Sequence, residues 1–256
     1  MKILGVIPAR YGSTRFPGKP LVLINSQPMI QHVYQRCLKA KMLDEVVVAT
    51  DDKRIYDCVR AFNGQAVMTS KKHLSGSDRI AEVLRKPQYR GFNIILNIQG
   101  DEPLIDPRAI NLLVKDMADN PKQLMATLAT HFENAGDIAS PNTAKVVTDD
   151  QGRALYFSRC PIPFTRDENA GKARHFLKHI GMYAYRRNFL IKFTQWPEGR
   201  LERLEKLEQL RALENGADIK VLHTNYSCLS VDSPGDVGKI ERQMKRSMGW
   251  GKKRIN

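Results

Sequence analysis

Three cationic side chains follow the first apolar segment of the chain. Arg10, Arg15 and Lys19 lie within ten residues of one another, interleaved with glycine, serine and threonine. Glycine lets a backbone approach phosphate oxygens closely, and arginine and lysine neutralise the charge of those oxygens. This loop therefore predicts a binding site for a nucleoside triphosphate.

The loop matches neither of the two common phosphate-binding motifs. Gly18 and Lys19 are followed by Pro20, so the Walker A pattern G-x-x-x-x-G-K-[ST] is absent, and the loop is not a G-x-G-x-x-G dinucleotide fingerprint. A solvated basic loop after an edge strand is the alternative interpretation of these residues taken alone.

Two isolated acids stand at positions where a metal ligand is expected. Asp101 follows an apolar strand-like segment, and Asp232 lies between a short apolar segment and Pro234. Magnesium is usually held by one or two carboxylates together with phosphate oxygens and water. A turn residue or a helix cap is the alternative role for each acid. Together with the cationic loop, the pair indicates metal-assisted nucleotidyl transfer.

The elements that must position these residues alternate between strand and helix over the first 130 residues. The apolar and β-branched runs predict strands at 3–7, 45–49, 65–68 and 92–98. Helices are predicted from Pro28 onward, from an Asp51 or Asp52 cap to Phe62, from a Ser77 or Asp78 cap to Leu84, and from Pro107 to about Asn120. This alternation predicts an α/β fold with a Rossmann-like, mainly parallel sheet, whose ligands bind at the carboxyl ends of the strands.

The pattern changes after residue 124. Strand-like runs at 125–130, 144–148, 154–158 and 178–185 predict an antiparallel extension or lid, and helices are expected at 187–195 and 202–214. A strand at 219–223 and a helix from Pro234 follow. We expect one nucleotidyltransferase domain over 1–245, with a core of 1–123 and 204–245, an extension for sugar binding and dimerisation over 124–203, and a basic tail over 246–256.

The chain of 256 residues carries a formal net charge of +14, and residues 239–254 contribute seven Lys or Arg against one acid. This excess suits an enzyme that collects polyanionic small molecules; nucleic-acid binding is a weaker expectation, because no nucleic-acid-binding motif accompanies it. No apolar run reaches the length of a membrane span, and the N-terminal residues lack a signal-peptide pattern, so we expect a cytoplasmic protein without membrane contact. The four scattered cysteines form no C-x-x-C pair and indicate neither a disulfide framework nor a zinc site.

Seven separated motifs, spread between residue 3 and about residue 240, carry a family resemblance. They are IPARYGSTRFPGKPL, VATDD, SGSDR, NIQGDEPLI, ALYFSR, KHIGMYAY and LEKLEQLRALENG. In this order they resemble the 3-deoxy-manno-octulosonate cytidylyltransferases, the CMP-Kdo synthetases, where Kdo is 3-deoxy-D-manno-octulosonate.

The resemblance implies an enzyme that joins CTP and Kdo with Mg²⁺, releases pyrophosphate and acts as a homodimer in lipopolysaccharide synthesis. It implies catalytic roles for Arg10, Lys19, Asp101 and Asp232, with the two acids as metal ligands. It implies nucleotide contacts for Pro8, Ala9, Arg10, Arg15, Lys19, Ser75, Gly76, Arg79 and Gln99. It implies sugar-acid contacts for Gln99, Arg159, Arg166, His179, Tyr183, Glu208 and Gln209.

Two alternatives to this function stay open at the level of sequence. Lys178 stands where many family members have arginine, so the sugar can instead be an 8-amino-8-deoxy-Kdo or a sialic-acid-like acid. In a different class, the same sheet can carry a non-catalytic protein that binds nucleotides or nucleic acid. The presence of both Asp101 and Asp232 argues against a non-catalytic protein, since binding alone needs no metal ligands.

Overall fold

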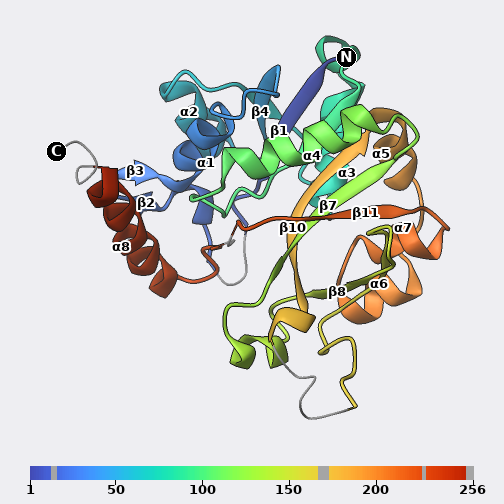
Figure 1. The fold of residues 1–256 in the computed structure, drawn as a ribbon. Coiled ribbons are helices and arrows are strands. Elements are labelled where there is room, and N and C mark those ends of the chain that lie inside the picture. The colour runs from blue at the N-terminus through green and yellow to red at the C-terminus, as the bar shows by residue number, and fades with distance from the viewer. Residues whose placement is uncertain (13–15, 167–172, 227–228, 252–256) are drawn as a thin grey trace. The chain divides into compact units, whose positions relative to one another are not determined.

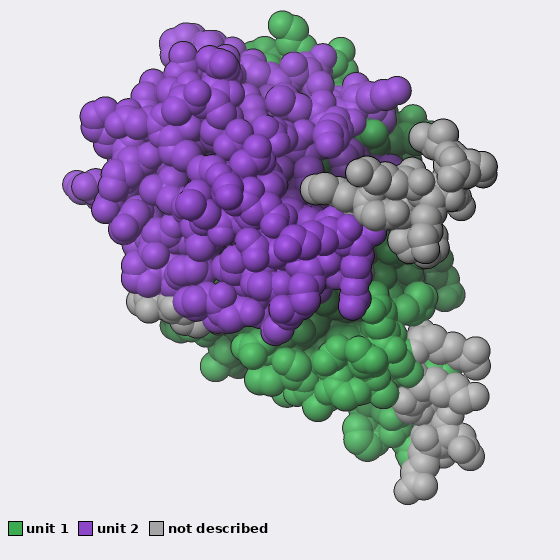
Figure 2. All heavy atoms as spheres, turned by 90° about the vertical axis from the view of Figure 1, so that its left-hand side faces the viewer, with its two compact units in different colours: residues 1–3, 91–96, 109–227 green, residues 4–90, 97–108, 228–256 purple. Residues whose placement is uncertain are grey.

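The computed structural model describes residues 1–12, 16–166, 173–226 and 229–251, drawn as coloured ribbon in Figure 1. Its chain divides into two compact units, coloured separately in Figure 2. Unit 1 comprises residues 1–3, 91–96 and 109–227, and unit 2 comprises residues 4–90, 97–108 and 228–256.

Unit 2 is built on parallel strands that alternate with helices. Strand β1 pairs in parallel with β4, and β4 pairs in parallel with β5. Six of the seven residues of β1 are buried, as expected for a parallel strand covered on both faces. The helices and strands of this unit are β1 (Ile3–Ala9), η1 (Lys19–Leu21), β2 (Leu23–Ile24), β3 (Gln27–Pro28), α1 (Met29–Cys37), β4 (Glu45–Thr50), α2 (Lys53–Ala61), β5 (Ala66–Met68), α3 (Gly76–Arg85), η2 (Pro87–Tyr89) and α8 (Pro234–Gly251).

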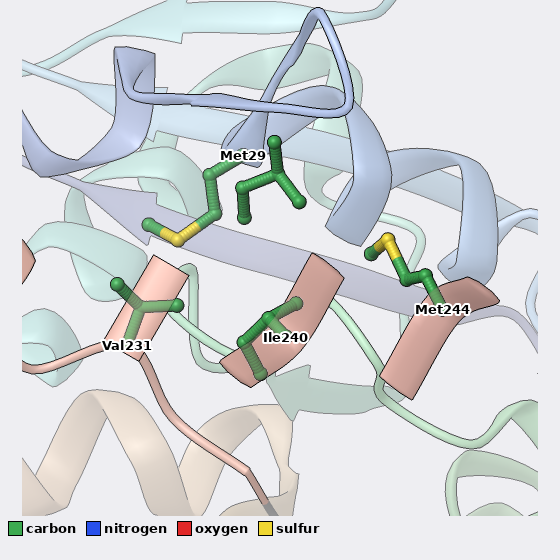
Figure 3. Packing of buried hydrophobic residues seen from close by; sticks show 5 residues of the cluster. Met29, Val231, Ile240 and Met244 are labelled. Carbon is green, nitrogen blue, oxygen red and sulfur yellow. The ribbon is translucent and has the colours of Figure 1, made fainter. Parts of the chain in front are cut away.

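The C-terminal helix α8 is joined to the N-terminal part of unit 2 by an apolar cluster. Met29 at the start of α1 packs with Val231, and with Ile240 and Met244 of α8, as Figure 3 shows. All four are at most 5% exposed. Because Val231 directly precedes Asp232, this packing fixes where that acid stands.

Unit 1 contains the antiparallel pairs of the larger sheet, and the short antiparallel pair β2–β3 belongs to unit 2. Strand β10 runs antiparallel to β7 and β8, β8 runs antiparallel to β9, and β11 pairs with β7 in parallel. The elements of this unit are β6 (Ile94–Asn97), α4 (Pro107–Asp119), β7 (Met125–His131), η3 (Ala135–Ala139), β8 (Lys145–Thr148), β9 (Ala154–Ser158), η5 (Ala173–His175), β10 (Leu177–Arg186), α5 (Arg187–Phe193), α6 (Arg200–Glu205), α7 (Leu210–Glu214) and β11 (Ile219–His223). The predicted fold class, an α/β fold with parallel strands and an antiparallel extension, is confirmed.

The compact units divide the chain differently from the predicted core and extension. Most of α4, and α7 and β11, belong to the same unit as the predicted extension 124–203. The reason lies in strand pairing: β11 is hydrogen-bonded along β7 and therefore belongs to the same unit.

Two predicted helix features are wrong. Helix α3 is capped by Ser75, whose hydroxyl accepts the Asp78 amide at 3.1 Å, and not by Ser77 or Asp78. The helix predicted over 202–214 is two helices, α6 and α7, because Lys206 adopts a left-handed φ of 53° between them.

Candidate active site

The predicted nucleotide and metal residues converge on one cavity of about 330 Å³, whose lining residues all belong to unit 2. It is lined at the carboxyl end of β1, by η1, by the segment that opens α3, by the residues after β6 and by Asp232. The predicted residues among the lining are Pro8, Ala9, Arg10, Lys19, Ser75, Gly76, Arg79, Gln99, Asp101 and Asp232. Arg15 lies outside the described residues.

The loop between β1 and η1 is closed by Gly18. Its amide donates to the Tyr11 carbonyl at 2.9 Å, and its φ is 71°, a left-handed conformation that favours glycine. The Tyr11 ring lies so near that a Cβ at Gly18 would be 3.1 Å from it. On α2, the Arg54 guanidinium stacks over the same ring at 3.3 Å, and Asp52 holds that guanidinium through two hydrogen bonds. The loop therefore has a defined end, at which Lys19 begins η1.

Lys19, Asp101 and Asp232 meet inside the cavity although they are far apart in sequence. The Lys19 ammonium lies 2.6 Å from Asp101 Oδ2 and 3.8 Å from Asp232 Oδ1. The two acidic segments are joined directly, because the Val231 amide donates to the Asp101 carbonyl at 2.9 Å. The side chains of Lys19 and Asp101 are 18% and 26% exposed, so a ligand can reach both.

The two carboxylates fit the Mg²⁺ that the family resemblance implies. Both already face one cation, the Lys19 ammonium, and carboxylate oxygens are the donors that Mg²⁺ prefers. Within the described part of the chain, no cluster of three or more His, Cys, Asp or Glu is arranged to hold a metal. The remaining ligands of a metal held by Asp101 and Asp232 would therefore come from substrate phosphates and water.

The segment opening α3 forms another wall of the cavity. Gly76 stands close to β1, where an added Cβ would lie 3.2 Å from the Pro8 ring. Arg79, one turn into the helix, is 3% exposed and donates to Asp51 Oδ2 at 2.8 Å and to Thr69 Oγ1 at 2.5 Å. These bonds occupy much of the Arg79 guanidinium, so the side chain ties α3 to the ends of β4 and β5 as well as lining the cavity.

The predicted sugar-acid residues, apart from Gln99, lie in unit 1. On β10, the rings of His179 and Tyr183 are 5.5 Å apart, and His179 Nε2 lies 3.0 Å from the Thr127 hydroxyl. Burial lowers the pKa of His179 to about 3, so its ring is neutral at neutral pH. Burial, together with the negative charge of Glu208, raises the pKa of the Tyr183 hydroxyl well above its usual value.

The other predicted sugar-acid residues differ in burial and in the hydrogen bonds that their side chains make within the protein. Gln209 is 3% exposed, and its Nε2 has no hydrogen-bond partner among the described residues. Arg159 donates through its guanidinium to the carbonyls of Pro141, Glu205 and Lys206, three bonds from a group with five N–H donors. Arg166 is exposed.

Comparison with known proteins was decisive for the family. The sequence profile of the family described as Cytidylyltransferase matches residues 4–219. A 3-deoxy-manno-octulosonate cytidylyltransferase of Solibacter usitatus (strain Ellin6076) is 50% identical over 250 residues, which cover 98% of this chain and 97% of the relative. One of Geotalea daltonii (strain DSM 22248 / JCM 15807 / FRC-32) is 51% identical over 253 residues, covering 96% and 99%.

A solved structure agrees with these relatives. It is a CMP:2-keto-3-deoxy-manno-octonic acid synthetase complexed with CTP, 46% identical to this chain, with a TM-score of 0.90. The match covers 96% of this chain and 100% of that one. This chain belongs to the 3-deoxy-manno-octulosonate cytidylyltransferase family.

In this cytidylyltransferase the cavity also contains residues that the sequence analysis missed. Pro20, Met29, His73, Leu74 and Gly100 line it beside the predicted residues. His73 and Leu74 directly precede the Ser75-Gly76 motif, so the signal that would have found them was adjacency to a predicted binding segment. Gly100 directly precedes Asp101, and a Cβ there would lie 3.1 Å from the Pro8 carbonyl oxygen.

The described residues of this cytidylyltransferase contain no helix long and apolar enough to cross a membrane. The longest helix among them, α8, has two different faces: Ile240 and Met244 pack into unit 2, while Arg242, Lys245 and Arg246 are exposed. Among the described residues, Cys37, Cys58 and Cys160 are free thiols.

Proposed function

We propose that the protein transfers CMP from CTP to 3-deoxy-D-manno-octulosonate. The reaction releases pyrophosphate and forms CMP-Kdo, which is used for lipopolysaccharide synthesis. The observation that carries the proposal is the cavity of unit 2, which Arg10 and Lys19 line together with Asp101 and Asp232, and in which the Lys19 ammonium pairs with both carboxylates. The names of the relatives and of the CTP-bound structure support both substrates.

Each wall of the cavity has a part in this reaction. Arg10 and Lys19 receive the triphosphate and stabilise the charge that develops on the departing pyrophosphate. The segment Ser75-Gly76 meets the base and the ribose, where main-chain groups can distinguish cytosine from uracil by their donor and acceptor patterns. The anomeric oxygen of the sugar then attacks the α-phosphorus in line while the bond to the pyrophosphate oxygen breaks.

Asp101 and Asp232 hold Mg²⁺ in this proposal. When bound, the metal supplies Lewis-acid chemistry: it polarises the α-phosphate and favours ionisation of the sugar hydroxyl. The residues themselves place two negative charges where the sugar oxygen and the α-phosphate must meet. Lys19, whose ammonium pairs with both carboxylates, would turn to the phosphates when the nucleotide binds.

The sugar-acid contacts in this proposal come from the residues that the family resemblance implies. His179, with a neutral ring, and Tyr183, with its hydroxyl protonated, can each donate to a sugar oxygen. The unsatisfied Gln209 Nε2 is a further donor, and a guanidinium such as that of Arg159 or Arg166 matches a carboxylate in two hydrogen bonds. We also propose a homodimer located in the cytoplasm, where CTP is available.

Pyrophosphate release in the presence of CTP, Mg²⁺ and a panel of sugar acids tests this function. We expect release with Kdo only when all three components are present, and a lower kcat/KM with an 8-amino-8-deoxy-Kdo or a sialic acid. No release with all three components would refute the proposal. A higher kcat/KM for another sugar of the panel would keep the chemistry and change the substrate.

The variant Asp101→Asn tests the metal ligand within the same assay. Because it removes a charged ligand while keeping the shape of the side chain, we expect kcat to fall by about 100-fold or more, while CTP still binds. Asp57→Asn is the matched control, since Asp57 is exposed on α2, where its carboxylate pairs with Lys53 away from the cavity. Unchanged turnover of Asp101→Asn would refute the assignment of Asp101 to the metal.

A further inference from the structure

The wall of the cavity between β5 and α3 is held by polar contacts. Four consecutive residues, His73 to Gly76, line the cavity at this wall. The apolar member of the four, Leu74, is 90% exposed and therefore contributes almost no burial. A loop without buried apolar side chains keeps its shape only through hydrogen bonds, so those bonds decide where the wall stands.

Glu82, two turns into α3, makes two of these bonds with one oxygen. Its Oε2 accepts the Ser70 amide at 2.8 Å and contacts His73 Nε2 at 2.5 Å. The side chains of His73 and Glu82 are 19% and 28% exposed. Glu82 does not line the cavity itself. Glu82 can therefore affect the cavity only through the loop residues to which it is hydrogen-bonded.

The chemistry of this contact is that of an anion with two donors. Burial alone would raise the pKa of Glu82, but the hydrogen bonds from the Ser70 amide and His73 hold that pKa below its usual value. The side chain is therefore a carboxylate at neutral pH. Hydrogen bonds to a charged acceptor are about twice as strong as those between neutral groups.

Arg79 ties the start of the same loop to α3. Its guanidinium donates to Thr69 Oγ1 at 2.5 Å and to the Ser70 carbonyl at 3.3 Å. Ser70 is thus held at its carbonyl by Arg79 and at its amide by Glu82, from two turns of one helix. Between Ser70 and the Ser75 cap, the side chain of His73 connects the loop to α3 through its contact with Glu82.

We propose that Glu82 and His73 form a positioning pair that fixes the base-binding wall of the cavity and thereby sets affinity and selectivity for the cytosine ring. This inference rests on the proposed function, because it takes the nucleotide to be CTP. Main-chain groups of the wall can read the base only at hydrogen-bond distance, so a shift of the loop weakens binding of CTP. The pair acts on binding and leaves the groups at the α-phosphorus in place.

The variants Glu82→Gln and His73→Leu test this pair by direct titration of CTP and by steady-state kinetics. We expect the Kd and KM of CTP to rise about tenfold, because each variant loses one charge-assisted hydrogen bond. The kcat and the KM of Kdo should stay within a factor of two of the wild-type values. The preference for CTP over UTP should narrow. His73→Gln keeps an N–H donor for Glu82 and should restore most of the affinity.

Two controls separate positioning from general destabilisation. Asp57→Asn makes the same loss of one carboxylate on α2 and should leave CTP binding unchanged. Inorganic triphosphate, which lacks a base, should bind wild type and Glu82→Gln equally. An equal loss of triphosphate and CTP affinity would overturn the proposal, because the defect would then lie outside the base wall.

The outcomes distinguish the two levels of inference. A wild-type protein that does not bind CTP refutes the proposed function. Wild-type binding of CTP that neither Glu82→Gln nor His73→Leu weakens overturns the positioning pair and leaves the proposed function standing.

Discussion

At the scale of single residues, Lys19 links the anionic and cationic sides of the cavity. Its ammonium lies within hydrogen-bond distance of Asp101 and within 3.8 Å of Asp232, so it neutralises the two acids that are proposed to hold the metal. An ammonium and a divalent cation repel each other at such distances. Metal binding therefore requires the Lys19 ammonium to leave the carboxylates. The triphosphate of the nucleotide is the anion with which the ammonium can then pair.

The variant Lys19→Met tests this competition. Without the ammonium, the two carboxylates should bind Mn²⁺ in the absence of nucleotide more tightly, by about twofold to fivefold as expected for one partly exposed charge pair. Isothermal titration or electron paramagnetic resonance of Mn²⁺ measures this affinity. Lys19→Arg, which keeps the charge, is the matched control. Weaker Mn²⁺ binding by Lys19→Met would show that the lysine supports the metal site.

At the scale of elements, the errors of sequence reasoning have geometric causes. Leucines recur every third residue from 201 to 213, which favours one long helix, but a helix turns every 3.6 residues and such a row drifts around it. Leu204 is consequently 71% exposed, whereas Leu210 is fully buried. The chain breaks the helix at Lys206, so that Leu207, between the two short helices, and Leu210, at the start of α7, are buried while Leu204 of α6 stays exposed.

The β1–η1 loop provides an element-scale prediction through Gly18→Ala. Alanine at a φ of 71° costs about 1–2 kcal/mol, and its Cβ would also press on the Tyr11 ring. We expect lower stability in urea and weaker CTP binding. Gly216→Ala is the matched control, because Gly216 has the same φ but an added Cβ there would meet no atom within 4 Å, so only stability should fall. Equal CTP affinity of Gly18→Ala and wild type would contradict a role of the loop in phosphate binding.

At the scale of the whole molecule, His179 makes stability depend on pH. Burial lowers its pKa from 6.5 to about 3, so below pH 6.5 the unfolded chain takes up a proton that the native chain does not. Its contribution is present above pH 6.5 and is lost progressively as the pH falls toward 3. At pH 5 the loss is about 2 kcal/mol.

Urea unfolding at pH 7 and pH 5 measures this loss. The free energy of unfolding should fall more between the two pH values in wild type than in His179→Gln, which cannot titrate. Parallel decreases in the two proteins would mean that other groups account for the pH dependence.

The sequence by itself determined the element types, the fold class and the residues that could carry the chemistry. Local patterns suffice for this: continuous apolar and β-branched runs, helix caps, and a cationic loop directly after a buried strand. Family motifs added roles for Asp101 and Asp232 that the residues alone left ambiguous between caps and ligands.

Only the tertiary structure decided which of these residues meet. Lys19, Asp101 and Asp232 are separated by 82 and 131 positions, and packing of α8 with the Val231–Asp101 hydrogen bond brings them together. Likewise, His73 gained a partner in Glu82 because α3 directs that carboxylate toward the loop that carries the histidine. Such contacts depend on burial and chain crossing, which no local pattern of residues encodes.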